Sequence, residues 1–111
     1  RYLMNFLQIE TRLVLLSELD VKGRGTQLLI EICKAMGAST FLVQGQAQKF
    51  LDAKLFQEDG IELRSFRYIP PIYPQLWGDF LANLSTFDLI FNCGPMARDI
   101  LMRHQPTILG F

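Results

Sequence analysis

Residues 27–36 form the most regular segment of the sequence, and they constrain the fold most strongly. Apolar side chains recur there at the spacing of one helix face, at Leu28, Leu29, Ile32, Cys33 and Met36. Gly37 follows, and glycine readily adopts the left-handed conformation in which many helices end. We therefore expect a helix from Gln27 to Met36 whose apolar stripe belongs to the core.

Three short segments have the composition of strands, and helical patterns separate them. Residues 12–16 hold a compact apolar run, and residues 39–43 are rich in strand-favouring side chains. Residues 61–68 alternate between apolar and charged side chains with one slip. The slip favours an edge strand with a bulge for the third segment. A helical pattern at 46–56 lies between the second and third strands. Strands joined by helices predict parallel pairing through right-handed crossovers.

The rest of the chain is predicted to be mostly helical. We expect a weak helix at 1–8, a short one at 79–84, a buried one at 86–93 capped by Ser85 with Asp88 as its capping-box partner, and a last one at 95–103, before a tail. The sequence thus predicts a three-layer α/β fold with a mostly parallel sheet, crossover helices and carboxyl-terminal helices. All 111 residues are expected to form a single domain.

Composition excludes several classes of protein. Eleven basic residues balance eleven acidic ones, so there is no basic field of the kind that nucleic-acid binding needs. The apolar runs are too short to cross a bilayer, and no signal peptide is visible, so we expect no membrane partner and a cytoplasmic protein. Cys33 and Cys93 are expected to be reduced, inert thiols. The single histidine, His104, argues against a metal site.

One candidate ligand site follows the first expected strand. Ser17 and Glu18 end that strand, and the loop 22–26 leads into the helix. The charge of Lys22, the open backbone at Gly25 and the hydroxyl of Thr26 suit a phosphate or a carboxylate beside free helix N–H groups. The alternative is an ordinary solvated loop. A second group, Gln44 and Gly45, follows the next strand, where ligands bind in open parallel sheets.

Two further candidates lie in the second half of the chain. Tyr73 and Gln75 stand in a proline-stiffened loop and offer a ring, a hydroxyl and an amide, which suit a base or a sugar. Asn92 stands where one helix meets the next. The alternative is a structural corner whose tyrosine packs on the core. No catalytic residue, cofactor or oligomeric state can be derived from the sequence.

The order of several segments resembles the carboxyl-terminal part of the WbqC-like protein family. The likeness covers residues 15–101 and is strongest at Thr26–Leu29, Ile32–Gly37, Tyr73–Gln75 and Leu84–Pro95. Gln44 and Met96 depart from the family pattern, which has a serine and often an acidic residue at those places. Family members also carry an upstream half with a His-Gln-Pro segment, which this chain lacks. We therefore expect the chain to be the carboxyl-terminal portion of such a protein.

The resemblance implies a bacterial protein associated with O-antigen, a surface polysaccharide. The leading hypothesis is modification of a sugar or nucleotide sugar, with an anionic ligand at the carboxyl ends of the strands. The second hypothesis is a truncated domain that binds a ligand or partner without catalysis.

Overall fold

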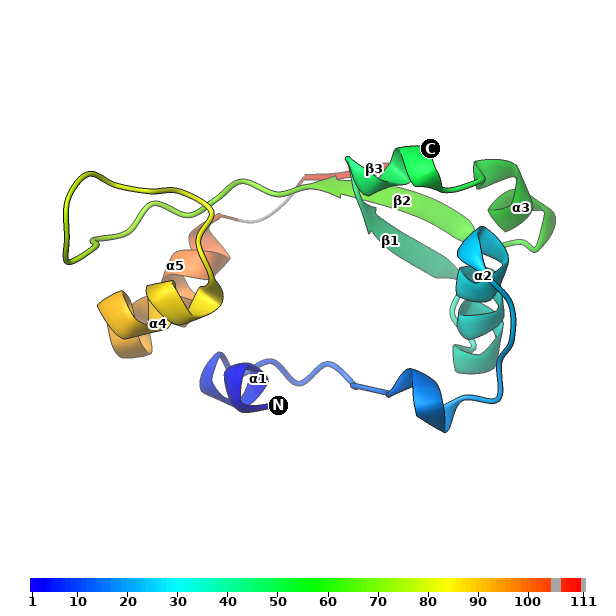
Figure 1. Ribbon diagram of the computed structural model, residues 1–111, viewed down its shortest axis with the longest axis horizontal. Coiled ribbons are helices and arrows are strands. Elements are labelled where there is room, and N and C mark those ends of the chain that lie inside the picture. Colours follow the sequence, from blue (N-terminus) through cyan, green and yellow to red (C-terminus); the bar gives the residue numbers. More distant parts are fainter. Residues whose placement is uncertain (105–106, 111) are drawn as a thin grey trace. The chain divides into compact units, whose positions relative to one another are not determined.

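The computed structural model describes residues 1–104 and 107–110 (Figure 1). These residues group into two compact units. The first unit comprises the described residues of 1–12 and 68–106, and the second those of 13–67 and 107–111.

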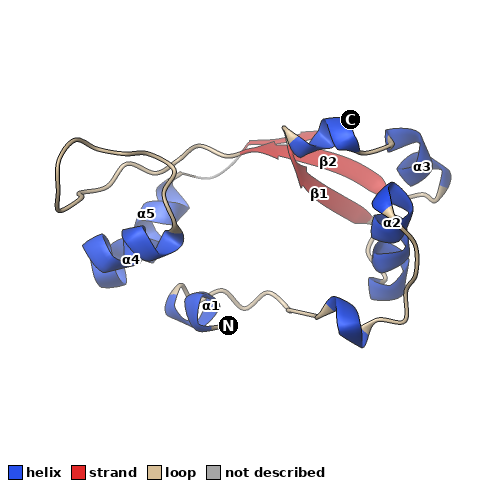
Figure 2. Cartoon of the chain, viewed as in Figure 1, coloured by secondary structure: helices blue, strands red, loops and turns tan. Residues whose placement is uncertain are grey.

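The second unit contains a three-stranded sheet (Figure 2). Its strands are β1 (Thr40–Gln44), β2 (Glu62–Arg67) and β3 (Thr107–Gly110), in the order β1-β2-β3. β1 pairs parallel to β2, whereas β3 pairs antiparallel to β2. The fold is therefore mixed α/β with a mixed sheet. The antiparallel strand falls in the segment that the sequence predicted to be a tail, and that prediction was wrong.

Helices α2 (Gly25–Met36) and α3 (Ala53–Glu58) contribute to one apolar core with the sheet, and the 3₁₀ helix Ala47–Phe50 lies between β1 and α3. Ile30 of α2 and Phe56 of α3 are fully buried, at 0% exposure. Val43 of β1 and Leu63 of β2 complete the centre of this core. The opposite face of β1 carries the exposed Leu42, and a three-layer arrangement is not confirmed.

The helix predicted at 27–36 is confirmed, and Gly37 caps it in the left-handed conformation at φ 66°. The predicted stripe was only partly right. Cys33 is buried as expected, but the most buried residue of α2 is Ile30, which the pattern did not include. Leu28 remains half-buried. The stripe was displaced because Ile30 and Cys33, three residues apart, share the face that meets the sheet.

The strand predicted at 12–16 is not formed. This segment is irregular and leads into a 3₁₀ helix, Leu16–Glu18. The carboxylate of Glu18 accepts a hydrogen bond from the backbone N–H of Leu15 at 3.2 Å, so the local turn uses a donor that a strand ladder would need. The strands at 39–43 and 61–68 are confirmed, but β2 is the middle strand rather than an edge strand.

The first unit consists of α1 (Tyr2–Phe6), α4 (Thr86–Cys93), the 3₁₀ helix Gly94–Met96, α5 (Ala97–Arg103) and the irregular segment that precedes α4. Its core residues are Leu7, Tyr73, Leu89, Ile90 and Ala97. Arg98 of α5 donates hydrogen bonds to the backbone carbonyls of Leu7 and Gln8, at 2.5 and 3.0 Å. This arginine fastens the residues after α1 to α5.

Two predictions for the first unit need correction. The sequence predicted a helix at 79–84, but this segment is irregular, because the side chain of Gln75 hydrogen-bonds the backbone of Leu81. Helix α4 was expected to be buried all round, yet Phe91 is 81% exposed. Its cap is confirmed, since Ser85 Oγ accepts from the N–H of Phe87 at 3.2 Å.

Candidate ligand-binding site

A long segment without helix or strand, residues 68–85, is attached to α4 through side-chain hydrogen bonds. Gln75 Nε2 donates to the carbonyl of Leu81 at 2.8 Å, and the N–H of Leu81 donates back to Gln75 Oε1 at 2.9 Å. The N–H of Leu76 donates to Asn92 Oδ1 at 3.0 Å. Gln75 therefore closes the loop 75–81, and Asn92 anchors Leu76 to α4, although the backbone of the loop forms no regular element.

Asp88 of α4 lies at the centre of this network. Its Oδ2 accepts a hydrogen bond from the hydroxyl of Tyr73 at 2.5 Å and one from Gln75 Nε2 at 3.2 Å. One turn later on the same helix, Asn92 Nδ2 donates to the backbone carbonyl of Asp88 at 2.8 Å. The structure thus brings together Tyr73, Gln75 and Asn92, three of the residues that the sequence singled out.

The hydrogen bonds leave different groups free at these residues. Gln75 uses both amide N–H groups and its oxygen within the loop, and Tyr73 directs its hydroxyl proton to Asp88. Among the described residues, both hydrogen bonds to the Asp88 carboxylate end at Oδ2, so Oδ1 remains available as an acceptor. Asn92 retains one amide N–H. Tyr73 and Gln75 therefore support the site, while Asp88 and Asn92 keep capacity for a ligand.

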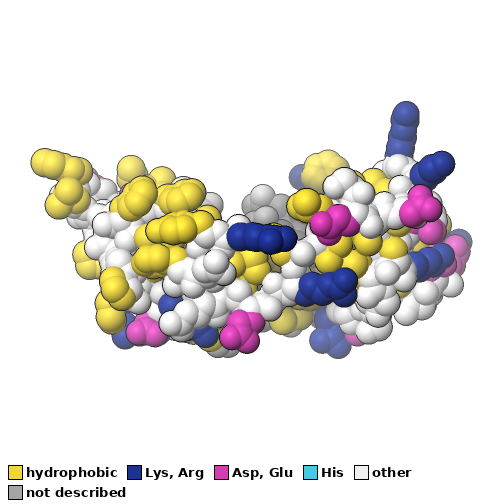
Figure 3. All heavy atoms as spheres, turned by 90° about the horizontal axis from the view of Figure 1, so that it is seen from below, with side chains coloured by type: hydrophobic (Ala, Val, Ile, Leu, Met, Phe, Trp, Pro, Cys, Tyr) yellow, Lys and Arg dark blue, Asp and Glu magenta, His cyan; other side chains and the backbone are white. Residues whose placement is uncertain are grey.

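A hollow of about 150 Å³ lies beside the network. Its polar lining consists of Gln75, Asp88 and Asn92, and its apolar lining consists of Leu76, Trp77, Leu81 and Leu84. Trp77 is 83% exposed and Leu76 is 78% exposed, so apolar surface is presented to solvent at this hollow. Hydrophobic side chains also gather on the visible face of this unit, at the left of Figure 3.

Burial and the neighbouring Asp88 raise the pKa of Tyr73 and of Cys93. Burial raises the pKa of Tyr73 above its ordinary value, and the hydrogen bond to Asp88 raises it further. Burial also raises the pKa of the Cys93 thiol, and the negative charge of Asp88 adds to this effect. Cys93 ends α4, where the helix dipole does not favour a thiolate. Both cysteines are free thiols, and neither has the environment of a nucleophile.

In the second unit, the predicted loop 22–26 leads directly into α2. Gly25 is the first residue of this helix and has φ 58°, and no side chain caps the helix start. Thr26 Oγ1 accepts a hydrogen bond from the N–H of Asp52 at 3.1 Å, which joins the start of α2 to the segment that follows β1. The loop does not follow a strand, because residues 12–16 do not form one. Its anion site stays a prediction.

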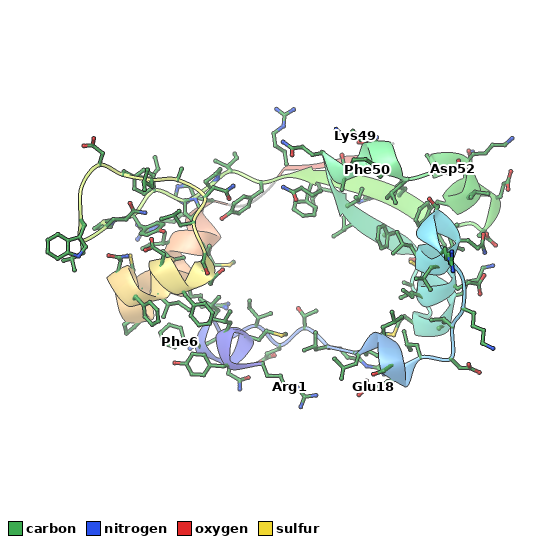
Figure 4. All side chains as sticks on the ribbon, viewed as in Figure 1. Arg1, Phe6, Glu18, Lys49, Phe50 and Asp52 are labelled. Atoms are coloured by element: carbon green, nitrogen blue, oxygen red, sulfur yellow. The ribbon has the colours of Figure 1, made fainter. Side chains whose placement is uncertain are left out.

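The remaining predicted residues of this unit are spread along it. Glu18 lies away from Asp52 and the start of α2 (Figure 4), so Ser17 and Glu18 do not join the 22–26 loop. Gln44 is the last residue of β1 and is exposed. The N–H of Gly45 donates to the carbonyl of Phe66 at 3.1 Å and thereby extends the pairing of β1 with β2.

Comparison with known proteins identifies the relationship of the chain. The profile of the WbqC-like protein family matches residues 1–100. The chain belongs to this family. It is also 32% identical over 98 residues to the uncharacterized protein Rv1507c of Mycobacterium tuberculosis, an alignment that covers 87% of this chain and 42% of the relative. The chain therefore spans about two-fifths of that relative's length. No solved structure matches the chain.

Two residues of the site in this WbqC-like protein were missed as ligand-binding candidates. The sequence indicated Asp88 only as a helix-capping residue and did not single out Trp77. A usable signal was present, because Asp88 and Asn92 stand four residues apart in a largely apolar helix and must share a face. Their long-range partners, Tyr73 and Leu76, could not be derived from local spacing.

In the part of the chain that the structure describes, no group of three or more His, Cys, Asp or Glu residues could hold a metal ion. None of the described helices combines the length and apolar character needed to cross a membrane.

Proposed function

We propose that this WbqC-like protein acts in the cytoplasm in the synthesis or modification of bacterial surface polysaccharide such as O-antigen. In this proposal the hollow beside α4 holds the sugar of a nucleotide-sugar ligand. The general role is what the resemblance to WbqC-like proteins implies, and the chain belongs to that family. The single observation that carries the choice of site is the network centred on Asp88, with Trp77 at its edge.

Sugars need a site with both polar and aromatic character. Their hydroxyl groups require directional acceptors and donors, which the carboxylate of Asp88 and the amide of Asn92 offer. Their C–H faces pack on an aromatic ring, which the exposed indole of Trp77 offers. Because Tyr73 and Gln75 hold Asp88 in place, the acceptor is oriented before a ligand arrives, and this reduces the ordering needed on binding.

The size of the hollow limits what it can enclose. About 150 Å³ is well below the range of about 300–1,000 Å³ that is typical of sites for drug-sized molecules. One sugar ring suits this volume better than a complete nucleotide sugar. We therefore place only the sugar moiety of the ligand in this hollow.

The test is a titration with neutral monosaccharides and with a nucleoside diphosphate sugar. Trp77 is the sole tryptophan of the chain, so its fluorescence reports directly on the hollow. We expect a saturable change in its emission at millimolar sugar. In nuclear magnetic resonance spectra, the amide signals of residues 75–81 and 88–92 should shift along the same titration curve.

Two aromatic variants provide matched comparisons in the resonance experiment. Trp77→Ala should weaken sugar binding about threefold to tenfold, the equivalent of a stacking interaction of about 0.5–1.5 kcal/mol. Phe50→Ala removes another ring that is 78% exposed, but this ring belongs to the second unit, and binding should not change. Equal losses in the two variants, or no shifts in wild type, would contradict the proposed site.

A further inference from the structure

Helices α1 and α4 of the first unit each carry a pair of exposed aromatic side chains. On α1, Tyr2 and Phe6 lie one turn apart, with ring centroids separated by 6.3 Å. On α4, Phe87 and Phe91 lie one turn apart, with ring centroids separated by 5.9 Å. Phe91 is 81% exposed and Tyr2 is 69% exposed, while Phe87 and Phe6 are 45% and 37% exposed. We call these four rings the aromatic patch.

The aromatic patch borders a single core. Leu3 of α1 packs against the buried cluster that includes Leu7, which follows α1, and Leu89 and Ile90 of α4. The two helices therefore turn neighbouring residues inward to one core and leave the ring pairs to solvent. Hydrophobic side chains gather over this unit on the face seen in Figure 3.

The area of the aromatic patch matches what an interface between two proteins needs. A fully exposed aromatic side chain presents about 200 Å², so the exposed parts of the four rings amount to about 450 Å². A standard interface covers about 800 Å² on each partner, of which about 57% is apolar. The apolar share of such an interface is therefore also about 450 Å². An exposed patch of several hundred Å² commonly marks a binding surface.

The helices that carry the aromatic patch are almost free of charge. The sequence of α1, Tyr2–Phe6, contains no charged residue, and Arg1 precedes it. The single charged residue of α4 is Asp88, which accepts hydrogen bonds from the side chains of Tyr73 and Gln75. Like charges that meet at an interface oppose association. A partner with the same uncharged aromatic surface meets no such opposition, whereas a strongly charged partner would find little opposite charge on these helices.

We infer that the aromatic patch is the contact surface of a homodimer, in which a second copy of the chain presents the same patch across a two-fold axis. An apolar, uncharged surface complements itself, and a two-fold contact closes after two copies. Tyrosine and phenylalanine are also enriched at the centres of interfaces. The inference goes beyond the proposed function, because the hollow beside α4 is lined by other residues.

The test is the mass of the full 111-residue chain in solution, measured by sedimentation velocity over a range of concentrations. Between about 5 and 500 μM we expect a transition from monomer to dimer, with a dissociation constant in the micromolar range. A monomer over the whole range would overturn the inference. Assembly that continues beyond the dimer would also overturn it, since a two-fold contact is closed.

Substitutions then assign the contact to the aromatic patch. Tyr2→Ala and Phe91→Ala should each weaken the dimer about tenfold or more, because both copies lose the ring. Phe50→Ala is the matched control, since it removes a ring that is 78% exposed but belongs to the second unit, and the dimer should persist unchanged. Circular dichroism checks that the variants fold. A dimer that survives both patch substitutions, or that Phe50→Ala weakens equally, would overturn the assignment.

Sugar binding separates this inference from the proposed function. The residues that line the hollow in the described structure do not include Phe91, so Phe91→Ala should bind neutral monosaccharides with wild-type affinity. A dimer that forms while no sugar binds would overturn the proposed function alone. Sugar binding by a chain that stays monomeric would overturn the inference alone.

Discussion

The two units of the protein maintain their structures in different ways. In the second unit, backbone pairing of β1 with β2 and an apolar core around Ile30 and Phe56 hold the chain. In the first unit, residues 68–85 form no helix or strand; the side chains of Gln75 and Asn92 hydrogen-bond their backbone, and Asp88 accepts from the side chain of Gln75. The second unit therefore depends on burial, and the loop of the first depends on a few directional hydrogen bonds.

This difference explains why the candidate site lies in the first unit. Regular pairing satisfies backbone groups and turns side chains toward a core, whereas an irregular loop requires polar side chains near its backbone. Once those side chains are in place, the groups that they do not use are available to a ligand. Long irregular segments in compact proteins are often binding loops for this reason.

The largest expected effect tests the burial of the second unit. Ile30→Ala should lower its free energy of unfolding by about 2–5 kcal/mol, because Ile30 is completely buried and its loss leaves a cavity. Urea unfolding followed by circular dichroism measures the change. Hydrogen exchange of the α2 and β1 amides then assigns it to this unit.

Ile32→Ala is the matched control, since Ile32 is a half-buried residue of the same helix. Its effect should be clearly smaller than that of Ile30→Ala. If the two substitutions were equally destabilising, the face of α2 that meets the core would be wrongly assigned.

A smaller effect is expected from Tyr73→Phe, which tests the hydrogen bonds of the first unit. The ring remains in the core, but Asp88 loses a donor, so the free energy of unfolding should fall by about 1.5–3 kcal/mol. Hydrogen exchange should accelerate at the N–H groups of Leu76 and Leu81, which the same network protects.

The pH dependence sharpens this prediction. Because the pKa of Tyr73 is raised in the folded protein, its stabilising effect is complete below the ordinary pKa of 10.0 and is lost as the pH rises through the folded value. The difference in stability between wild type and Tyr73→Phe should therefore shrink at strongly alkaline pH. A constant difference across this range would show that the hydroxyl proton is not what stabilises the loop.

The smallest expected effect concerns an anion at the start of α2. We predict that inorganic phosphate shifts the amide signals of Gly23 to Thr26, and that Lys22→Ala weakens this binding roughly tenfold or more. Lys34→Ala, at the opposite end of α2, should leave it unchanged. Thr26→Val should weaken it as well, but that variant also loses the acceptor for Asp52. Shifts confined to other residues would show that the loop only connects two segments.

The sequence predicted the elements whose side chains follow one regular period. Helix α2 and strands β1 and β2 could be found because Cys33, Gly37 and the alternating residues of 61–68 obey local rules. The apolar run at 12–16 has the same local pattern as a strand, but a strand also needs a partner strand to pair with. Local periodicity does not reveal whether such a partner exists. β3 was missed because its pairing with β2 is long-range.

The candidate site shows the same limit at the level of single residues. Tyr73, Gln75 and Asn92 were indicated by their chemistry, and they do meet in the structure. Asp88 was assigned to a local cap because Ser85 stands three residues before it, whereas its carboxylate binds Tyr73, fifteen residues earlier. Local spacing predicts local hydrogen bonds, and this carboxylate takes its partners from elsewhere in the chain.

The reciprocal pair between Gln75 and Leu81 has a consequence for how the site can evolve. Because the side chain of Gln75 contacts only the backbone of Leu81 in these two bonds, they place no demand on the side chains of Leu76, Trp77 and Asp79. Gly78, at φ 64°, and Phe80, whose ring packs edge-on against Tyr73, are constrained for other reasons. In the proposed sugar site, ligand preference could thus diversify by substitution at the three unconstrained positions, provided that position 75 remains glutamine.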